Sequence, residues 1–502
     1  MMSDNRFKLH PVTTIINFVK GLKDLLIPFL IIFAANGFNL SFNPKEEGFW
    51  AELIPLAVMT ILTILYLFNG IIKWWTFVYW FEDDELRVKY GLLVKKKRYI
   101  PFDRIQSFNY KEGIFHRVFG LVQVMVETAG STDGKPEVIL TAITKEAANQ
   151  IEQVTRKVKQ TKMEGVLEDE DGVDILEKDS NDHQQRIILK MKVKDLIILA
   201  STSNGIGVVL AGVAAVLSQF SEFIPYERIF EEVSSLIKFG VVVVAITIFA
   251  ALFIAWLISV IITFINYYDY TVIEEDERIT ITRGLLEKKR ITIPLNRIQA
   301  IKIIESPLKQ IFGYSSVVVE SASAGYGEKD KKMTLFPLIS KREVYNTLRD
   351  LMPAFEWEQP LTKPPKKAKP FFYRIDFLWL VPIIALSSYI WFPYGLLSIL
   401  IIIPVILIGL WQYKTTGFAI KGNQLTIVYR GISRVTFVVE KKRIQAMQSK
   451  QSYFQKRKNI ASVQATVMSG MTGATAKAAH LNVHDAEQVL LWFEKGVSEK
   501  TF

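Results

Sequence analysis

A segment that occurs three times constrains the fold of this chain more than any other feature of its sequence. Its markers are a Gly, an Arg-Ile-Gln triplet, a Phe-Gly pair and a Glu. They stand at Gly91, Arg104-Ile105-Gln106, Phe119-Gly120 and Glu127 in the first copy, and at Gly284, Arg297-Ile298-Gln299, Phe312-Gly313 and Glu320 in the second. The third copy keeps Gly431 and Arg443-Ile444-Gln445 but has Lys458-Asn459 and Thr466 in place of the other markers. The first two copies have identical spacings, and 193 residues separate Arg104 from Arg297, so each copy predicts a separate domain.

Long apolar runs precede each copy of the repeat. Half of the 502 residues are hydrophobic and the mean hydropathy is +0.22, a profile typical of a membrane protein with sizeable polar domains. The runs are Leu25–Phe42, Phe49–Ile72, Leu196–Phe220, Phe239–Tyr268 and Phe377–Tyr413, of which the last is long enough for two short spans. We expect a span rather than a signal peptide at the first run, because a second run follows at once.

These patterns predict a polytopic α-helical membrane protein with six transmembrane helices in three hairpins and three all-β domains, each ending in a C-terminal helix. The expected parts are 1–80 (N-terminal segment and first hairpin), 81–160 (first domain), 161–193 (acidic linker), 194–268 (second hairpin), 269–358 (second domain), 359–376 (Pro- and Lys-rich linker), 377–413 (third hairpin) and 414–502 (degenerate third domain). The predicted outer loops hold few Lys and Arg residues. By the positive-inside rule we expect a cell-membrane protein with both termini and all three domains in the cytoplasm.

The repeat resembles a known family. Gly-Leu-Leu, a basic cluster, Ile-Pro-x-x-Arg-Ile-Gln, Phe-Gly and Val-Glu-Ser/Thr-Ala follow one another as in the bacterial membrane-flanked, pleckstrin-homology-like (PH-like) domain. The resemblance covers nearly the whole chain, although the third copy lacks the Pro and the Phe-Gly pair. It implies that each domain is a seven-stranded β-sandwich or barrel closed at one end by a helix.

The polar side chains of the triplet are Arg104, Gln106, Arg297, Gln299, Arg443 and Gln445. In an extended segment, Arg297 and Gln299 point to one side and Ile298 to the other, into the core. An active site is one interpretation of this pattern. We favour a structural role, in which Arg and Gln bond backbone carbonyls and an acid such as Glu320, because an Arg at a domain edge is usually paired.

Two basic clusters follow the Gly-Leu-Leu turns, Lys95-Lys96-Lys97-Arg98 in the first copy and Lys288-Lys289-Arg290 in the second. Lys and Arg near a cytoplasmic leaflet gain about 1 kcal/mol each from anionic lipids. These seven residues are therefore candidate contacts for lipid headgroups. The alternative is a solvated positive loop without a specific ligand.

Several activities lack support in the sequence. With no Cys and five scattered His, we expect no metal and no cofactor. No Gly-rich phosphate loop, nucleophile elbow or carboxylate pair occurs, so we expect no catalytic residues and no enzyme activity. The net charge of +11 has no nucleic-acid motif beside it, so no nucleic acid is expected as a partner.

We therefore expect a non-enzymatic scaffold or adaptor in the maintenance of the bacterial envelope or in protection against membrane stress or membrane-active peptides. Its expected partners are anionic membrane lipids and another membrane protein of the same family. The alternative is a transporter or export component for a lipid or peptide, in which Asn36, Asn69 or Asn204 would line a path. We favour a role for these Asn residues in helix packing, because no Asp, Glu, Lys or Arg lies in mid-membrane.

Overall fold

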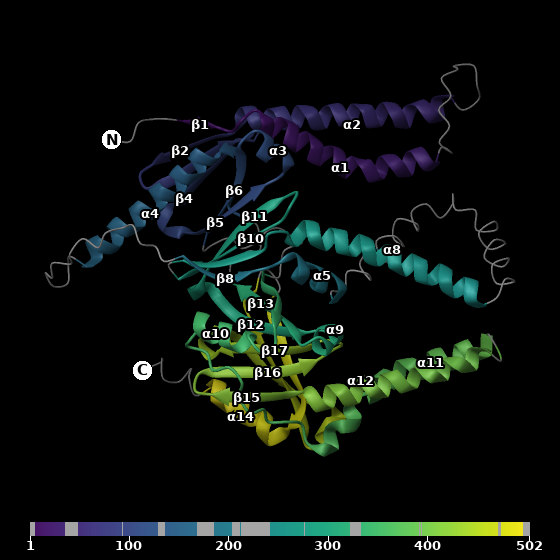
Figure 1. Ribbon diagram of the computed structural model, residues 1–502. Coiled ribbons are helices and arrows are strands. Elements are labelled where there is room, and N and C mark those ends of the chain that lie inside the picture. The colour runs from purple at the N-terminus through teal and green to yellow at the C-terminus, as the bar shows by residue number, and fades with distance from the viewer. Residues whose placement is uncertain are drawn as a thin grey trace. The chain divides into compact units, whose positions relative to one another are not determined.

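The computed structural model describes residues 6–35, 49–92, 94–128, 136–167, 185–202, 211, 241–275, 277–321, 333–390, 392, 394–469 and 473–494 (Figure 1). The chain forms two compact units. Unit 1 contains residues 1–130 and 136–292, and unit 2 contains residues 131–135 and 293–502. The unit boundary therefore falls inside the second repeat, so that its first strands belong to unit 1 and its later strands to unit 2.

Unit 1 holds the first repeat and the first sheet of the second. Its helices are α1 (Val12–Ala35), α2 (Phe49–Thr76), α3 (Ile114–Val118), α4 (Lys145–Leu167), α5 (Val193–Thr202) and α8 (Val241–Tyr267), with the 3-10 turn η1 (Phe102–Arg104). Its strands are β1 (Phe7–Lys8), β2 (Val78–Glu82), β3 (Glu85–Tyr90), β4 (Lys96–Pro101), β5 (Ile105–Glu112), β6 (Leu121–Thr128), β7 (Val138–Thr144), β8 (Arg186–Lys190), β9 (Thr271–Glu275), β10 (Arg278–Arg283) and β11 (Lys288–Pro294).

Unit 2 holds the second sheet of the second repeat and all of the third. Its helices are α9 (Pro307–Ile311), α10 (Val344–Leu351), α11 (Arg374–Ile390), α12 (Ile402–Thr415), α13 (Tyr453–Lys456) and α14 (Val483–Glu494), with the 3-10 segments η3 (Leu295–Arg297), η4 (Lys366–Phe372), η5 (Tyr394–Ile401) and η6 (Lys441–Arg443). Its strands are β12 (Ile298–Glu305), β13 (Tyr314–Ser321), β14 (Met333–Ser340), β15 (Gly417–Lys421), β16 (Gln424–Arg430), β17 (Arg434–Glu440), β18 (Ile444–Lys450), β19 (Ile460–Val467) and β20 (Ala474–Asn482).

Each repeat contributes an antiparallel first sheet and an antiparallel second sheet. The first repeat has the orders β1-β2-β3-β4 and β5-β6-β7, which together give the seven strands that the resemblance implied. In the third repeat, β15 to β20 are six strands, and a single bridge from Thr362 to Phe418 takes the place of the seventh among the described residues. Alternating apolar side chains build the cores, and α4 closes the first one by burying Ala148 and Ile151.

The turn between the first sheet's last two strands explains why the repeat begins with Gly. Gly91 has φ +99° and Gly284 has φ +108°, a region that residues with a side chain rarely adopt. A Cβ atom would lie 2.2 Å from the carbonyl oxygen of Val94 in the first turn and 2.1 Å from that of Glu287 in the second. Gly431 has no such neighbour, in keeping with the altered spacing of the third copy.

The prediction of six transmembrane helices in three hairpins is wrong. In the described part of the chain, two helical segments are long and apolar enough to cross a membrane, Phe249–Tyr267 and Gly395–Thr415. The apolar helices Val12–Leu22 and Trp379–Ile390 are shorter, and at 1.5 Å per residue the latter is about 18 Å long against a hydrocarbon core of about 30 Å. The uncharged run Phe377–Tyr413 therefore overstates the number of spans, because α11 ends at Ile390 and leaves an apolar helix that is too short to cross.

Several sequence expectations lie outside the described residues. They include the end of the run Leu25–Phe42 (36–42) with Asn36, most of the run Leu196–Phe220 (203–210 and 212–220) with Asn204, and the part 168–184 of the acidic linker.

Candidate functional site

In unit 1 the sheets of two neighbouring repeats pair edge to edge. We call such a pairing between strands of two repeats a joint. Strand β5 pairs antiparallel with β11, so that the unit contains one seven-stranded sheet of order β7-β6-β5-β11-β10-β9-β8. The paired residues are Glu112 with Lys288, Lys111 with Lys289, and Tyr110 with Arg290. Glu287 lies between the two like-charged Lys side chains, 2.6 Å from Lys111 Nζ and 3.4 Å from Lys289 Nζ. The carboxylate compensates a repulsion that two opposite Lys residues would otherwise cause.

A second joint of the same kind occurs in unit 2. Strand β12 pairs antiparallel with β17, and Glu305 lies opposite Arg434 with an Nη1 to Oε1 distance of 3.5 Å. Glu305 follows Glu112 by 193 residues, and Arg434 follows Lys288 by 146, the offsets that separate the repeat copies. The two joints therefore share one register, with an acid at the end of the second-sheet strand facing a base on the next repeat.

A buried acid lies behind each joint. Glu127 is 2% exposed, and its carboxylate accepts hydrogen bonds from Ser107 Oγ at 3.0 Å and Asn109 Nδ2 at 2.8 Å. Burial raises the pKa of Glu127 to about 7, although the two hydrogen bonds act in the opposite direction. Asn109 also accepts a hydrogen bond from the Thr292 backbone N–H at 3.1 Å, so it links the acid to β11.

The equivalent acid in unit 2 has a charged partner. Glu320 accepts a hydrogen bond from Lys302 Nζ at 2.6 Å and another from Ser469 Oγ. Lys302 occupies the position of Asn109, 193 residues later, and its ammonium lies 5.5 Å from the ring centre of Phe437 on β17. In both units the residue that holds the buried acid thus also contacts the strand of the next repeat.

The third repeat lacks this arrangement. Strand β18 is an edge of a three-stranded sheet of order β18-β19-β20 among the described residues, and most of its side chains are exposed. Gln451 stands at the position of Glu112 and Glu305, and Thr466 at that of the buried acid. The acids are therefore present in the two copies whose second sheet continues into another repeat.

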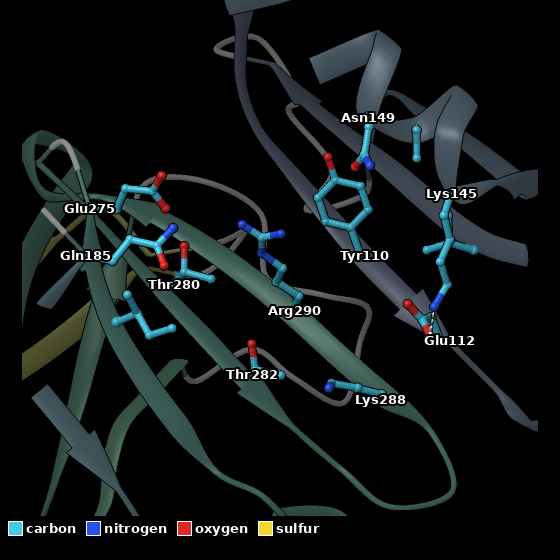
Figure 2. Close-up of a pocket in the computed structure, with 13 residues that line it drawn as sticks. Tyr110, Glu112, Lys145, Asn149, Gln185, Glu275, Thr280, Thr282, Lys288 and Arg290 are labelled. Carbon is cyan, nitrogen blue, oxygen red and sulfur yellow. Dashed lines mark hydrogen bonds and ion pairs between the residues drawn. The ribbon is translucent and has the colours of Figure 1, made fainter. Parts of the chain in front are cut away.

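A hollow of about 450 Å³ opens beside the joint in unit 1 (Figure 2). Lys145 Nζ lies 3.1 Å from Glu112 Oε2, and the Arg290 guanidinium lies 5.7 Å from the ring centre of Tyr110. Lys288 and Glu275 line the hollow as well. Five charged side chains, three basic and two acidic, make it suited to a polar ligand rather than an apolar one.

The Arg of the triplet ends a one-turn 3-10 segment between the two sheets in every repeat, η1, η3 or η6. Gln299 Nε2 donates to the Arg297 carbonyl at 3.1 Å, and Arg443 Nη2 donates to the Asn296 carbonyl at 2.6 Å. Glu320, the acid that we named as an example of a partner, accepts hydrogen bonds from Lys302 and Ser469, and the structural role of the triplet stays a prediction. Arg104, Gln106 and Gln445 share the same positions in the other copies, at the start of the second sheet.

The basic clusters differ in their surroundings. Lys95, Lys96 and Lys97 are exposed at the start of β4, which pairs only with β3 among the described residues, whereas Arg98 bonds Glu137. Lys288, Lys289 and Arg290 begin β11 and lie in the joint. Their contact with lipid headgroups stays a prediction for both clusters.

Sequence reasoning missed one position that is polar and buried in all three repeats. In α3, His116 Nε2 lies 2.8 Å from the Thr141 carbonyl oxygen, and in α9, Lys309 Nζ donates to the Pro337 carbonyl at 3.0 Å. In α13 the position holds Gln455, which bonds His480 Nδ1 at 2.8 Å. Burial lowers the pKa of Lys309 to about 8. The offset of 193 between His116 and Lys309 was the available signal.

No cluster of three His, Cys, Asp or Glu side chains suited to a metal ion occurs in the part of the chain that the structure describes.

Comparison with known proteins identifies the repeat. The profile of the family described as "Bacterial PH domain" matches residues 28–159, 196–352 and 376–497. The chain is 34% identical over 501 residues, 98% of its length, to the "UPF0699 transmembrane protein YdbT" of Bacillus subtilis (strain 168), of which the match covers 99%. No solved structure matches the chain.

Proposed function

Because the chain belongs to the bacterial PH domain family, we propose that it is a non-enzymatic membrane scaffold whose PH domains are held together by shared β-sheets. The observation that carries this proposal is the pair of joints, β5 with β11 and β12 with β17, which have the same register. Sheets joined by backbone hydrogen bonds fix neighbouring domains, as a scaffold requires and a mobile catalytic domain does not. The process we propose is envelope maintenance, including protection against membrane-active peptides.

The joints also support a topology. Two domains that share a sheet lie on the same side of a membrane, so the pairing of β5 with β11 supports one side for the first and second repeats, and that of β12 with β17 supports it for the second and third. The excess of Lys and Arg outside the predicted outer loops then favours the cytoplasmic side for all three domains and both termini. The Bacillus subtilis relative is called a transmembrane protein, which agrees with location in the membrane.

Anionic lipid headgroups are the ligand that we propose for the first basic cluster. Lys95, Lys96 and Lys97 are exposed, and the turn before them is tied to a helix end by the bond from Gly91 N to Thr76 Oγ1 at 3.2 Å. A fluorophore at Val94 of the full chain in vesicles should respond to anionic lipid at 0.1 M salt. The response should fade at 1 M, where the Debye length falls from about 10 Å to about 3 Å, and after charge reversal of the three Lys residues. A response that survives both changes would contradict this proposal.

Another membrane protein of the same family is the partner that we propose for strand β18. An exposed strand edge is a template for pairing with a further strand, and the equivalent edges of β5 and β12 are both occupied by a PH domain strand. A second copy of this chain is a poor partner, because the shared register would place Lys450 opposite Lys96 without an acid nearby.

The scaffold proposal can be tested by breaking and restoring one joint. Glu305→Arg places two Arg residues opposite each other, and adding Arg434→Glu restores an ion pair with the direction reversed. In a strain that lacks the protein, we expect the single variant to lose most of the protection against a membrane-active peptide and the double variant to regain it, at equal amounts in the membrane. Full protection by the single variant would refute the proposal. Hydrolysis of lipid, nucleotide or peptide by the purified protein, abolished by a point substitution, would refute its non-enzymatic character.

A further inference from the structure

The short helices α3 and α9 end in strongly exposed apolar side chains at matching positions. Val118 and Phe119 are 73% and 50% exposed, and Ile311 and Phe312 are 76% and 62% exposed. The members of each matching pair are 193 residues apart, and the two Phe residues belong to the repeated Phe-Gly marker. The Phe119 ring lies 6.5 Å from that of His10, yet half of it remains exposed. Packing within the domain therefore does not explain why an apolar residue recurs here.

The inner side of each short helix is fixed to its domain. His116 in α3 and Lys309 in α9 are buried and bond backbone carbonyls of the last strand of the second sheet. Ser306 caps the N-terminus of α9, where its Oγ accepts from the Lys309 backbone N–H at 3.4 Å. The orientation of both helices is thus set from within, and their apolar residues face outward.

In unit 1, α3 lies beside the end of an apolar helix. Arg117 in α3 donates to the Leu285 carbonyl, and the Leu285 backbone N–H donates to the Ile265 carbonyl at 2.8 Å. Ile265 belongs to the segment Phe249–Tyr267, which is long and apolar enough to cross a membrane. Leu286, in the same turn, is exposed.

In unit 2, other residues connect the short helix α9 to the end of an apolar helix. Gln310 in α9 accepts a hydrogen bond from Arg430 Nη2 at 3.1 Å, and the Arg430 guanidinium lies 3.8 Å from the ring centre of Trp411. Trp411 belongs to the apolar segment Gly395–Thr415. Ile432, in the adjacent turn, is exposed. Each unit thus carries an outward apolar surface next to the domain-side end of its apolar helix.

We propose that the ends of α3 and α9, with Leu286 and Ile432, insert into the lipid bilayer at the boundary between headgroups and acyl chains. The inference rests on the proposed membrane location and adds a monotopic contact to it. Apolar side chains enter this boundary to a depth of about 5–10 Å, and aromatic rings favour it. The contact is hydrophobic, so it is independent of salt, unlike the proposed headgroup contact of the basic cluster.

The third repeat provides an internal contrast. Its helix α13 is followed by Arg457 at the position of Val118 and Ile311, and by Lys458 at that of the two Phe residues. The Arg457 guanidinium lies 5.6 Å from the ring centre of Tyr453. A bilayer does not take up two adjacent charges as it takes up an apolar pair, so α13 stays outside.

Single labels can measure insertion, because the native chain has no Cys. The full chain is labelled with an environment-sensitive fluorophore at V118C, I311C or R457C and reconstituted in vesicles of zwitterionic lipid, with or without brominated acyl chains. A fourth label, I254C, lies within the apolar segment of α8 and reports whether that helix is in the bilayer. We expect emission at shorter wavelength and strong quenching by bromine at positions 118, 311 and 254, at both 0.1 M and 1 M salt, and neither effect at 457.

Two results overturn the inference alone: no quenching at 118 and 311 while 254 is quenched, or equal quenching at 118, 311 and 457. The first result would indicate that these helices contact water or a protein partner. The second would indicate that the third repeat contacts lipid in the same way as the first two. An unquenched label at 254 would instead refute the proposed membrane location itself.

Discussion

Replacing Glu127 by Gln tests the reasoning about the acid behind the first joint. The substitution keeps the shape of the side chain and removes its charge. A Gln can still accept from Asn109 Nδ2 with its oxygen and donate to Ser107 with its nitrogen, so both hydrogen bonds of the wild type have a replacement. The variant therefore isolates the free energy of ionising a carboxyl that is 2% exposed.

The magnitude follows from the pKa of Glu127, which burial raises from 4.5 to about 7. Between these pH values the folded state holds a proton that the unfolded state has lost, so stability falls as pH rises through this window. The protonated Glu127 side chain contributes fully to folding stability below pH 4.5, and this contribution is lost above pH 7. At 1.36 kcal/mol per pKa unit the loss is roughly 3 kcal/mol.

The assay is thermal unfolding of the full chain in detergent or lipid at pH 5 and pH 8.5, comparing variant and wild type at each pH. Because Gln does not ionise, we expect a small difference at pH 5 and a higher midpoint for the variant at pH 8.5, on the order of 5 °C. Comparing the difference at each pH removes the contribution of all other titrating groups.

Glu320→Gln is the matched control, at the same position of the next repeat. It leaves the Lys302 ammonium, whose side chain is 13% exposed, without its carboxylate. Breaking a buried ion pair costs about 3–5 kcal/mol, so this variant should unfold at a lower temperature at both pH values. If Glu127→Gln also lowers the midpoint at pH 8.5, or if its effect does not change with pH, the account of the buried acid is wrong.

Three further outcomes follow from other contacts. Asn109→Leu removes the acceptor of the Thr292 amide at a cost of about 1–3 kcal/mol, so hydrogen exchange of that amide should become faster, and unchanged exchange would disprove the link across the joint. Burial lowers the pKa of Lys309 to about 8, so the stability of the wild type should rise from pH 8 to pH 10. Lys309→Gln should remove this rise, and a rise that persists in the variant would contradict its assignment to Lys309. Gly284→Ala should destabilise by about 1–3 kcal/mol, because φ is +108° and a carbonyl lies 2.1 Å from the added Cβ, whereas Gly431→Ala should have little effect in the same thermal assay.

The family and the strands of each repeat were predictable because the responsible signals are local. Gly284 marks a turn that needs positive φ, and alternating apolar residues mark half-buried strands. Both signals lie within one repeat copy. The resemblance then supplied the strand count, which the first repeat bears out with seven strands.

The joints were not predicted, because pairing between distant strand edges is made by backbone groups that every residue has. Glu112 and Lys288 are 176 residues apart, and nothing in either strand alone specifies the other. A signal was present in the comparison of copies, since Glu112 and Glu305 recur while the third copy has Gln451. The number of spans failed in the third apolar run for another reason: hydropathy measures composition, whereas crossing also needs a helix of sufficient length, and Trp379–Ile390 is too short.

The shared sheets affect the solubility of truncated forms of this protein. A protein fragment that ends after the first repeat would carry β5 with its outer row of amide and carbonyl groups uncovered, and one containing the second repeat alone would uncover both β11 and β12. Such rows recruit any strand in solution, which leads to aggregation. Cutting between the compact units is no better, since that boundary lies within β11. Truncations that follow the repeat should therefore precipitate, and insoluble fragments of this protein would say little about the stability of the intact chain.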